Sequence, residues 1–126
     1  MKVNFEKTVV PCVVDDVVLW HLEHGFVWDA VEVPSGRRFG VFFATLLGGD
    51  GCIIHFYIRE KVSAATFLYG FRKAVRMAEE VFPAVFATVP ESKNKLVSVL
   101  QRVGFSILEN GGFDRKGEKI LLLKKL

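Results

Sequence analysis

The segment Arg59-Glu60-Lys61-Val62-Ser63-Ala64 brings basic, hydroxyl and small side chains together where an apolar run ends and an amphipathic run begins. The amphipathic run predicts a helix, and the first backbone N–H groups of a helix have no partner within it. Together with the helix dipole, these N–H groups favour an anion such as a pyrophosphate. The residues expected to contact that anion through charge, a hydroxyl group or close backbone approach are Arg59, Lys61, Ser63, Ala64 and Ala65. The branched side chain of Val62 is expected to obstruct the approach, which glycine would permit. An ordinary helix capped by Ser63 explains the same pattern without any ligand.

Neither cysteine fits a metal site or a disulfide framework. Cys12 and Cys52 are the only cysteines of the chain, and no spacing typical of metal ligands accompanies them. No leading apolar run ends in a small-residue cleavage site, so a signal peptide is not expected. The sequence therefore predicts reduced thiols in a cytoplasmic protein. No membrane span is expected either, because Asp15 and Asp16 interrupt the apolar stretch over residues 9–20.

The composition predicts one globular domain over residues 1–126. The chain is 51% apolar and 13% aromatic, which excludes an intrinsically disordered protein. Apolar periodicity predicts strands over residues 3–7, 26–33, 39–47, 52–58, 85–89, 105–109 and 119–126. The same analysis predicts helices over residues 11–25 and 63–82, and a third helix capped by Ser92 and ended by Gly104. Pro11 is expected in the first turn of the first helix, Gly25 at its end, and Asn110-Gly111-Gly112 in a turn.

The order of these elements predicts an α/β fold. The strand, helix and strand over residues 52–58, 63–82 and 85–89 form a unit that requires a parallel pair with a right-handed crossover. The flanking strands follow one another through short turns, which predicts antiparallel hairpins. A central mixed sheet with helices on both faces follows from these two features.

This order and two local signatures resemble the GNAT superfamily of acyl-CoA-dependent N-acyltransferases. The first signature is AVFATVPESKNKLVSVLQRVGF at residues 84–105, in which a strand and a polar loop precede a helix that ends in Gly-Phe. The second is the loop Arg59-Glu60-Lys61-Val62-Ser63-Ala64, where family members usually carry Gln/Arg-x-x-Gly-x-Gly/Ala. The resemblance covers most of the chain and is strongest from Gly51 to Leu126.

The resemblance implies a GNAT-like fold that binds acetyl-CoA or a related acyl-CoA. The pyrophosphate would lie on the loop before the main helix, and pantetheine would lie between the strands over residues 52–58 and 85–89. Pantetheine would bond the backbone near Phe56, Tyr57 and Ile58. The family's helix-starting Asn falls on Lys93, with Asn94 one residue later, and Lys93 would contact phosphate instead. The family's Tyr, which protonates the leaving thiolate, is replaced by Leu100.

A transferase of this kind needs a general base for its amine acceptor, and three residues are candidates. His55 lies in an apolar strand, alternates with its neighbours and has a suitable ordinary pKa. A hydrogen-bonded core histidine is the alternative reading. Glu60 and Glu91 lie in loops near the expected cleft, where a capping or solvated carboxylate is the alternative. His21 and His24 are expected on the surface of the first helix.

Three functions remain open from the sequence. The leading one is an N-acyltransferase acting on an amine, in a small molecule or a protein. The second is a catalytically inactive GNAT-fold interaction or phage assembly protein, homo-oligomeric and virion-associated, without CoA chemistry. The third is nucleic-acid binding, because residues 1–58 carry a net charge of −3 and residues 59–126 carry +6. No recognition motif accompanies the third function, so a nucleic-acid partner is not expected.

Overall fold

The computed structural model describes residues 2–7, 10–24 and 26–126 and confirms the predicted order of elements. The strands are β1 Lys2–Lys7, β2 Val27–Val33, β3 Arg38–Leu46, β4 Gly51–Ile58, β5 Ala84–Pro90, β6 Phe105–Phe113 and β7 Lys119–Lys125. The helices are α1 Asp16–Glu23, α2 Ala64–Val81 and α3 Asn94–Val103. No helix within the described ranges is long and apolar enough to cross a membrane.

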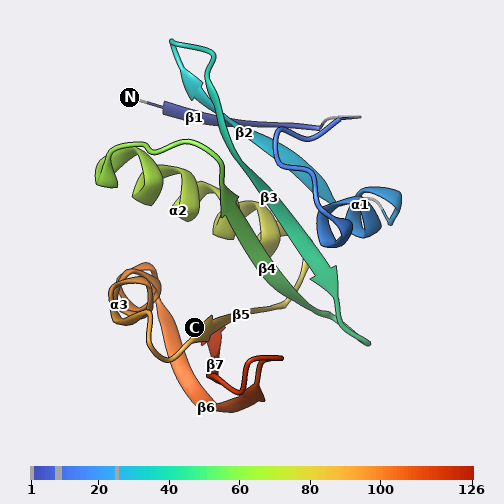
Figure 1. Cartoon of the computed structure of the whole chain (residues 1–126), viewed down its shortest axis with the longest axis vertical. Helices are drawn as coiled ribbons and strands as arrows, with labels where there is room; N and C mark the ends of the chain where they lie inside the picture. The colour runs from blue at the N-terminus through green and yellow to red at the C-terminus, as the bar shows by residue number, and fades with distance from the viewer. Residues whose placement is uncertain (1, 8–9, 25) are drawn as a thin grey trace.

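One seven-stranded mixed sheet joins all the strands in the order β1-β2-β3-β4-β5-β7-β6. The β4–β5 pair is parallel and the other neighbours are antiparallel. Helices α1 and α2 lie on opposite faces of the sheet (Figure 1). The expected α/β fold, with a mixed sheet and helices on both faces, is therefore confirmed.

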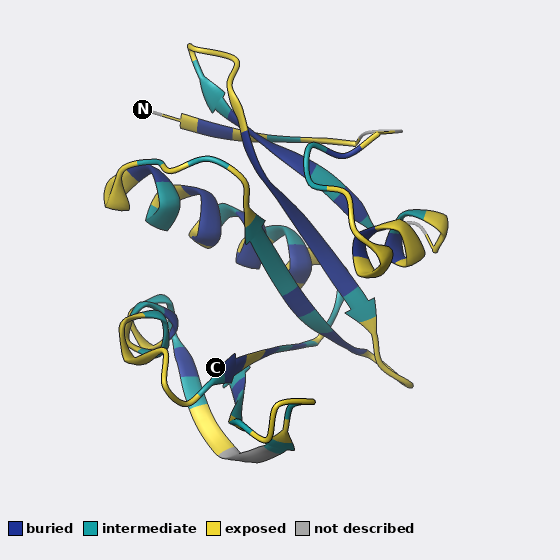
Figure 2. Cartoon of the chain, in the orientation of Figure 1, coloured by how far each residue is buried: buried dark blue, intermediate teal, exposed yellow. Residues whose placement is uncertain are grey.

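Two apolar layers hold the helices on the sheet. On one face, Phe71 of α2 and Leu100 of α3 pack into a core shared with β3, β4, β5 and β7. On the other face, Val18 of α1 packs with Val41 and Phe43 of β3. Most of β3 is dark blue in Figure 2, the colour of buried residues, because both faces of this strand are covered. Strand β3 therefore contributes buried side chains to the apolar layers on both faces of the sheet.

Strands β4 and β5 separate after a short parallel ladder. Their pairing runs from Gly51–Ala84 to Ile53–Phe86. Beyond that point β4 stays paired with β3 as far as Ile58, and β5 stays paired with β7 as far as Pro90. The two strands therefore diverge in the middle of the sheet, each held in place on its outer side.

Helix α1 starts later than the sequence predicts. Pro11 lies before the helix, which begins at Asp16. The carboxylate of Asp15 accepts a hydrogen bond from the Val18 N–H at 2.8 Å and so acts as the N-cap. The helix ends at Glu23, and the predicted end at Gly25 lies outside the described residues.

Two further boundaries differ from the prediction. Ser92 does not cap α3, because its hydroxyl donates to the carboxylate of Glu118, and Lys93 occupies the N-cap position without a side-chain hydrogen bond. The predicted turn over residues 110–112 lies inside β6, whose register with β7 shifts there. The chain turns at Asp114 instead, because the Asp114 carboxylate accepts hydrogen bonds from the N–H groups of Lys116 and Glu118.

Candidate active site

A cavity of about 230 Å³ lies where β4 and β5 diverge. Consecutive residues of both strands, 54–57 and 87–90, line it. Successive side chains of a strand point to opposite faces, so the cavity lies between the strands, in the plane of the sheet. Phe67 and Phe71 of α2, Leu96 and Leu100 of α3, and Lys93 at the N-cap of α3 cover it from one face. An apolar slot of this shape suits a narrow, extended ligand.

Phe56 and Tyr57 line this slot, and Ile58 follows them at the end of β4. These residues pair with Phe42, Val41 and Gly40 of β3 on one side. On the other side β5 has already diverged. A strand edge left open in this way can pair with an added extended chain, as the resemblance implies for pantetheine.

His55 faces the α1 side of the sheet, opposite Ile54 and Phe56, as its alternation predicts. Its ring stacks on Phe43 with centroids 4.7 Å apart, and its Nε2 lies 3.0 Å from Oγ1 of Thr45. Burial, and secondarily the proximity of His21, lowers the pKa of His55 to about 4. His55 is therefore uncharged at neutral pH and available as a hydrogen-bond or proton acceptor.

His21 is buried, so the expectation that it lies on the surface is wrong. Only 7% of it is exposed. Its Nδ1 lies 2.7 Å from the Val17 carbonyl oxygen and its Nε2 lies 2.6 Å from Oγ1 of Thr45. It faces β3, where it bonds Thr45. His24 is exposed as expected, and its Nδ1 bonds the Trp20 carbonyl oxygen at 2.7 Å.

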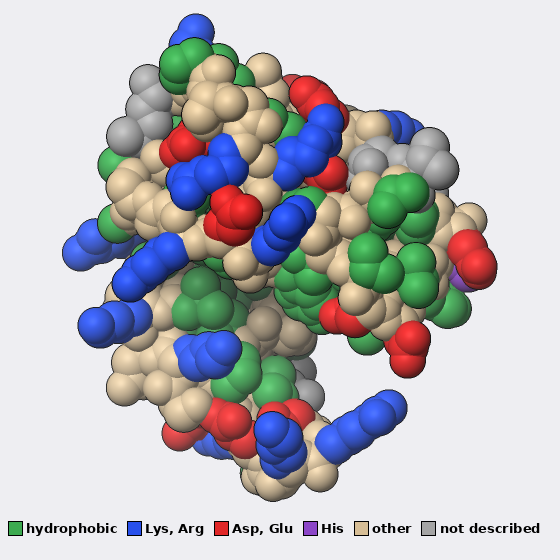
Figure 3. Space-filling view, turned by 45° about the horizontal axis from the view of Figure 1, so that its top comes forward, with side chains coloured by type: hydrophobic (Ala, Val, Ile, Leu, Met, Phe, Trp, Pro, Cys, Tyr) green, Lys and Arg blue, Asp and Glu red, His purple; other side chains and the backbone are tan. Residues whose placement is uncertain are grey.

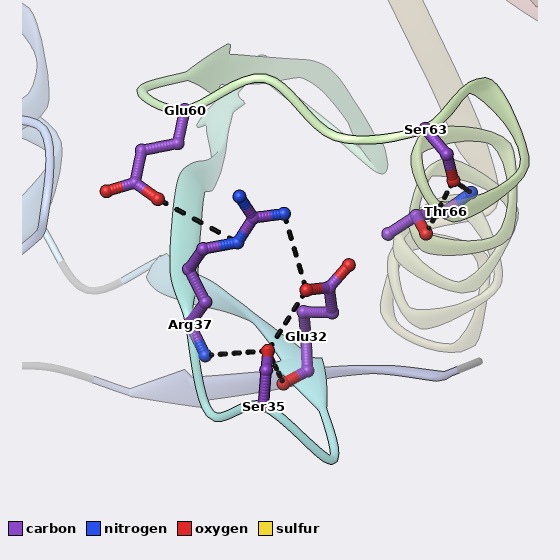
Figure 4. A network of polar contacts seen from close by, with 6 residues as sticks. All are labelled: Glu32, Ser35, Arg37, Glu60, Ser63 and Thr66. Atoms are coloured by element: carbon purple, nitrogen blue, oxygen red, sulfur yellow. Dashed lines mark hydrogen bonds and ion pairs between the residues drawn. The ribbon is translucent and has the colours of Figure 1, made fainter.

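The two candidate carboxylates are held in ion pairs away from the slot. Oε2 of Glu60 lies 3.8 Å from Nε of Arg37, which also contacts Glu32 at 3.3 Å (Figure 4). Oε2 of Glu91 lies 3.1 Å from Nζ of Lys119. Neither carboxylate lines the cavity. Of the three candidate bases, His55 is the one that borders the slot.

The start of α2 is a helix N-terminus capped by Ser63, as the alternative without a ligand predicts. Ser63 is the N-cap: its Oγ accepts a hydrogen bond from the Thr66 N–H at 3.1 Å and donates to Oγ1 of Thr66 at 2.9 Å (Figure 4). Ala64 and Ala65 are exposed in the first turn, where backbone N–H groups have no helical partner. Lys61 is exposed beside them.

The side chain of Val62 points away from the start of α2. It packs against the buried cluster formed by Val3, Ala30 and Phe39. The obstruction expected from its branched side chain is therefore absent at the helix start. This packing was not apparent from the sequence, because it depends on β1 lying beside the loop.

Arg59 and the thiols lie away from the helix start. The Arg59 guanidinium lies close enough to Cys12 to oppose the rise of its pKa, which burial and Asp29 cause. The thiol of Cys12 donates to the Gly40 carbonyl oxygen at 3.2 Å. Burial raises the pKa of Cys52 to about 11. Both cysteines are free, and both thiols stay protonated at neutral pH, so neither is an activated nucleophile.

Thr45 is the functional candidate that the sequence analysis missed. It brings His21 of α1 and His55 of β4 into one hydrogen-bonded chain. The sequence predicts that Thr45 lies in an apolar strand, but its two hydrogen-bond partners belong to elements that are distant in sequence. Only the packing of α1 on β3 shows the connection.

The fold is that of GNAT acetyltransferases. An acetyltransferase from Bacillus subtilis in complex with CoA superimposes with a TM-score of 0.78 at 14% identity, covering 98% of this chain and 97% of that one. An IAA acetyltransferase from Bacillus cereus gives a TM-score of 0.77 at 15% identity, covering 98% and 97%. A GNAT-family acetyltransferase from Bacillus anthracis gives 0.68 at 8% identity, covering 82% and 67%. No family model and no curated protein sequence matches the chain.

Proposed function

We propose that residues 1–126 form a single GNAT-like domain that transfers an acetyl or related acyl group from acyl-CoA to an amine. The observation that carries the proposal is the slot between β4 and β5. The slot is narrow, lined from both strands and closed on one face by α2 and α3, which fits the extended pantetheine arm. The thioester would then lie within the sheet, beside His55.

The phosphates of the cofactor would lie at the start of α2. Lys61 and the N–H groups of Ala64 and Ala65 would meet the pyrophosphate. Lys93 borders the slot and a separate hollow at the start of α3, so it would meet phosphate from the other side. This assignment uses a helix terminus and cations together, the combination that favours anionic ligands.

A larger hollow of about 600 Å³ begins at Ala65 and runs along α2. Arg72 and Arg76 contribute exposed cations to it, and Tyr69 contributes an aromatic ring. The nucleotide end of CoA carries a 3′-phosphate and an adenine ring. Cations and an aromatic side chain suit those two groups, which supports placing the nucleotide there.

The reaction uses the groups around the slot as follows. The amine nitrogen attacks the thioester carbon, a C–N bond forms and the C–S bond breaks. The proton lost by nitrogen passes to the ring nitrogen of His55 that does not bond Thr45, and His55 then returns it to solvent. Leu100, at the position of the family's Tyr, is a buried apolar residue that carries no proton to give, so the released thiolate of CoA takes a proton from water.

The acceptor is proposed to be an amine, of a small molecule or a protein, and the location is proposed to be the cytoplasm, which suits two free thiols. Nucleic acid is a weaker fit for a partner. Lys and Arg side chains are interspersed with Asp and Glu on the face seen in Figure 3, and several are paired, as Arg37 is with Glu32.

A second candidate function is an interaction module without CoA chemistry, as in a self-associating or virion assembly protein. The edge strand β6 favours it, because Ile107, Leu108 and Phe113 are 44%, 50% and 70% exposed. Exposed apolar side chains on an edge strand are a means of pairing with a second chain.

The test of the transferase is thiol release. The protein is incubated with acetyl-CoA and a panel of polyamines, aminoglycosides, amino acids and lysine peptides, and free CoA is followed with a thiol reagent. We expect release that depends on both the protein and one class of amine, with acetylated amine found by mass spectrometry. Hydrolysis alone, or no release by folded protein with any amine, would favour the interaction module.

A further inference from the structure

A continuous polar chain crosses the apolar layer between α1 and β4. It consists of His21, Thr45 and His55, with contacts of 2.6 Å from His21 Nε2 to Thr45 Oγ1 and 3.0 Å from Thr45 Oγ1 to His55 Nε2. Its far end is fixed, because His21 Nδ1 lies 2.7 Å from the Val17 carbonyl oxygen. Aromatic rings surround the chain: Phe43 lies against both histidines.

The carbonyl at the far end sets the direction of every hydrogen bond in the chain. A carbonyl oxygen only accepts, so His21 Nδ1 must carry a hydrogen and donate it. In its uncharged form, His21 therefore accepts at Nε2, and the Thr45 hydroxyl donates to it. A hydroxyl has one hydrogen, so Thr45 Oγ1 accepts from His55, whose Nε2 must carry the hydrogen. The lone pair of His55 is thereby placed on Nδ1.

The Nδ1 atom of His55 is open to a ligand. Nε2 is the ring nitrogen that is bonded within the chain. In the part of the chain that the structure describes, no buried side-chain nitrogen or oxygen lacks a partner, so Nδ1 is not sealed in the apolar layer. His55 also borders the slot between β4 and β5. A histidine with one ring nitrogen outside the chain therefore borders the proposed acyl site.

We infer that His21 and Thr45 are positioning residues that hold His55 in its Nε2–H tautomer and so present the Nδ1 lone pair to the amine. The role in catalysis rests on the proposed transferase function. The tautomer itself does not, because it follows from the three hydrogen bonds with His21 in its uncharged form.

Nitrogen-15 NMR of the histidine rings tests the tautomer directly, because protonated and unprotonated ring nitrogens have distinct shifts. At a pH where the same spectra show a single protonated nitrogen on each ring, we expect Nδ1–H for His21 and Nε2–H for His55. Thr45→Val removes the hydroxyl and should leave His55 in a mixture of both tautomers. Thr45→Ser restores the hydroxyl and should restore the single tautomer. His24→Gln is the control variant, since His24 bonds a helical carbonyl as His21 does but makes no bond to Thr45.

The kinetic readout separates positioning from binding. Thr45→Val should lower kcat by about tenfold, a part of the roughly 10²–10⁴ that a general base contributes, with KM for acyl-CoA unchanged. Thr45→Ser and His24→Gln should keep the kcat of the unaltered protein. A His55 that carries its hydrogen on Nδ1, or a tautomer unaffected by Thr45→Val, overturns the inference even if the protein is an active transferase. A folded protein with the expected tautomers and no acyl transfer refutes the proposed function instead.

Discussion

The depressed pKa of His55 predicts that the protein loses stability in acid through this one side chain. His55 stacks on Phe43 and bonds Thr45, in surroundings that disfavour its charged form. Its pKa falls from an ordinary value of 6.5 to about 4, and His21 is the other titratable ring packed beside it. The unfolded chain therefore binds a proton at His55 in a range of pH where the folded chain does not.

The sign and size follow from proton linkage. Between pH 6.5 and about 4 the unfolded state carries one more proton, so the free energy of unfolding rises with pH. The stabilisation is present above the unfolded pKa and is lost as pH falls through the folded pKa. The separation between the two pKa values corresponds to about 3 kcal/mol of unfolding free energy.

The variant His55→Phe tests this value while keeping a ring against Phe43. Urea unfolding is measured at about pH 7 and about pH 4 for both proteins. The other titratable groups then contribute equally to the change in unfolding free energy of each protein between the two pH values. We expect the unaltered protein to lose about 3 kcal/mol more than the variant over this range. The variant His24→Gln, which lacks an exposed histidine, should lose as much unfolding free energy over this pH range as the unaltered protein does. Curves for His55→Phe that run parallel to those of the unaltered protein would refute the reasoning.

Two further predictions concern stability. Arg38→Met should lower the free energy of unfolding in urea, because it leaves the 1% exposed carboxylate of Asp29 without its ion pair at 2.9 Å. The neighbouring Arg37→Met, whose partners are more exposed, should cost less than about 1 kcal/mol, and an equal loss in both variants would contradict the assignment. Gly40→Ala should cost about 1–3 kcal/mol in thermal unfolding, because its Cβ would lie 2.5 Å from a carbonyl oxygen of β4. Gly48→Ala meets no atom within 4 Å, so a comparable loss there would show that the contact is not the cause.

The sequence predicted the elements whose local signals agree with one another. Helix α2 has a capping Ser63, a sustained helical period and Pro83 after its end, and the structure shows all three. Helix α1 was placed too early because a valine-rich run carries no clear boundary, and the cap at Asp15 competes with Pro11. The turn after β6 was misplaced because glycines within a strand signal a turn as strongly as Asp114 does.

The sequence predicted how the backbone strands of the candidate site are arranged, and it predicted only some of the side-chain positions. Element order predicted the parallel pair of β4 and β5 with its crossover, and the resemblance to the GNAT superfamily implied a slot near Phe56. Side-chain roles depended on packing between distant elements. The inward turn of Val62 and the burial of His21 required β1 and α1 to be in place, and no local pattern encodes either.

Binding of acyl-CoA in the slot is the central claim, and thermal unfolding with and without acetyl-CoA tests it most directly. Desulfo-CoA, which keeps pantetheine and all the phosphates, and ATP, which lacks pantetheine, serve as comparison ligands. At about 100 times its dissociation constant a ligand adds roughly 2.7 kcal/mol to the free energy of unfolding. The account predicts a clear rise in Tm with acetyl-CoA and desulfo-CoA and a smaller one with ATP. An unchanged Tm with millimolar acetyl-CoA, in protein shown to be folded by circular dichroism, would contradict it.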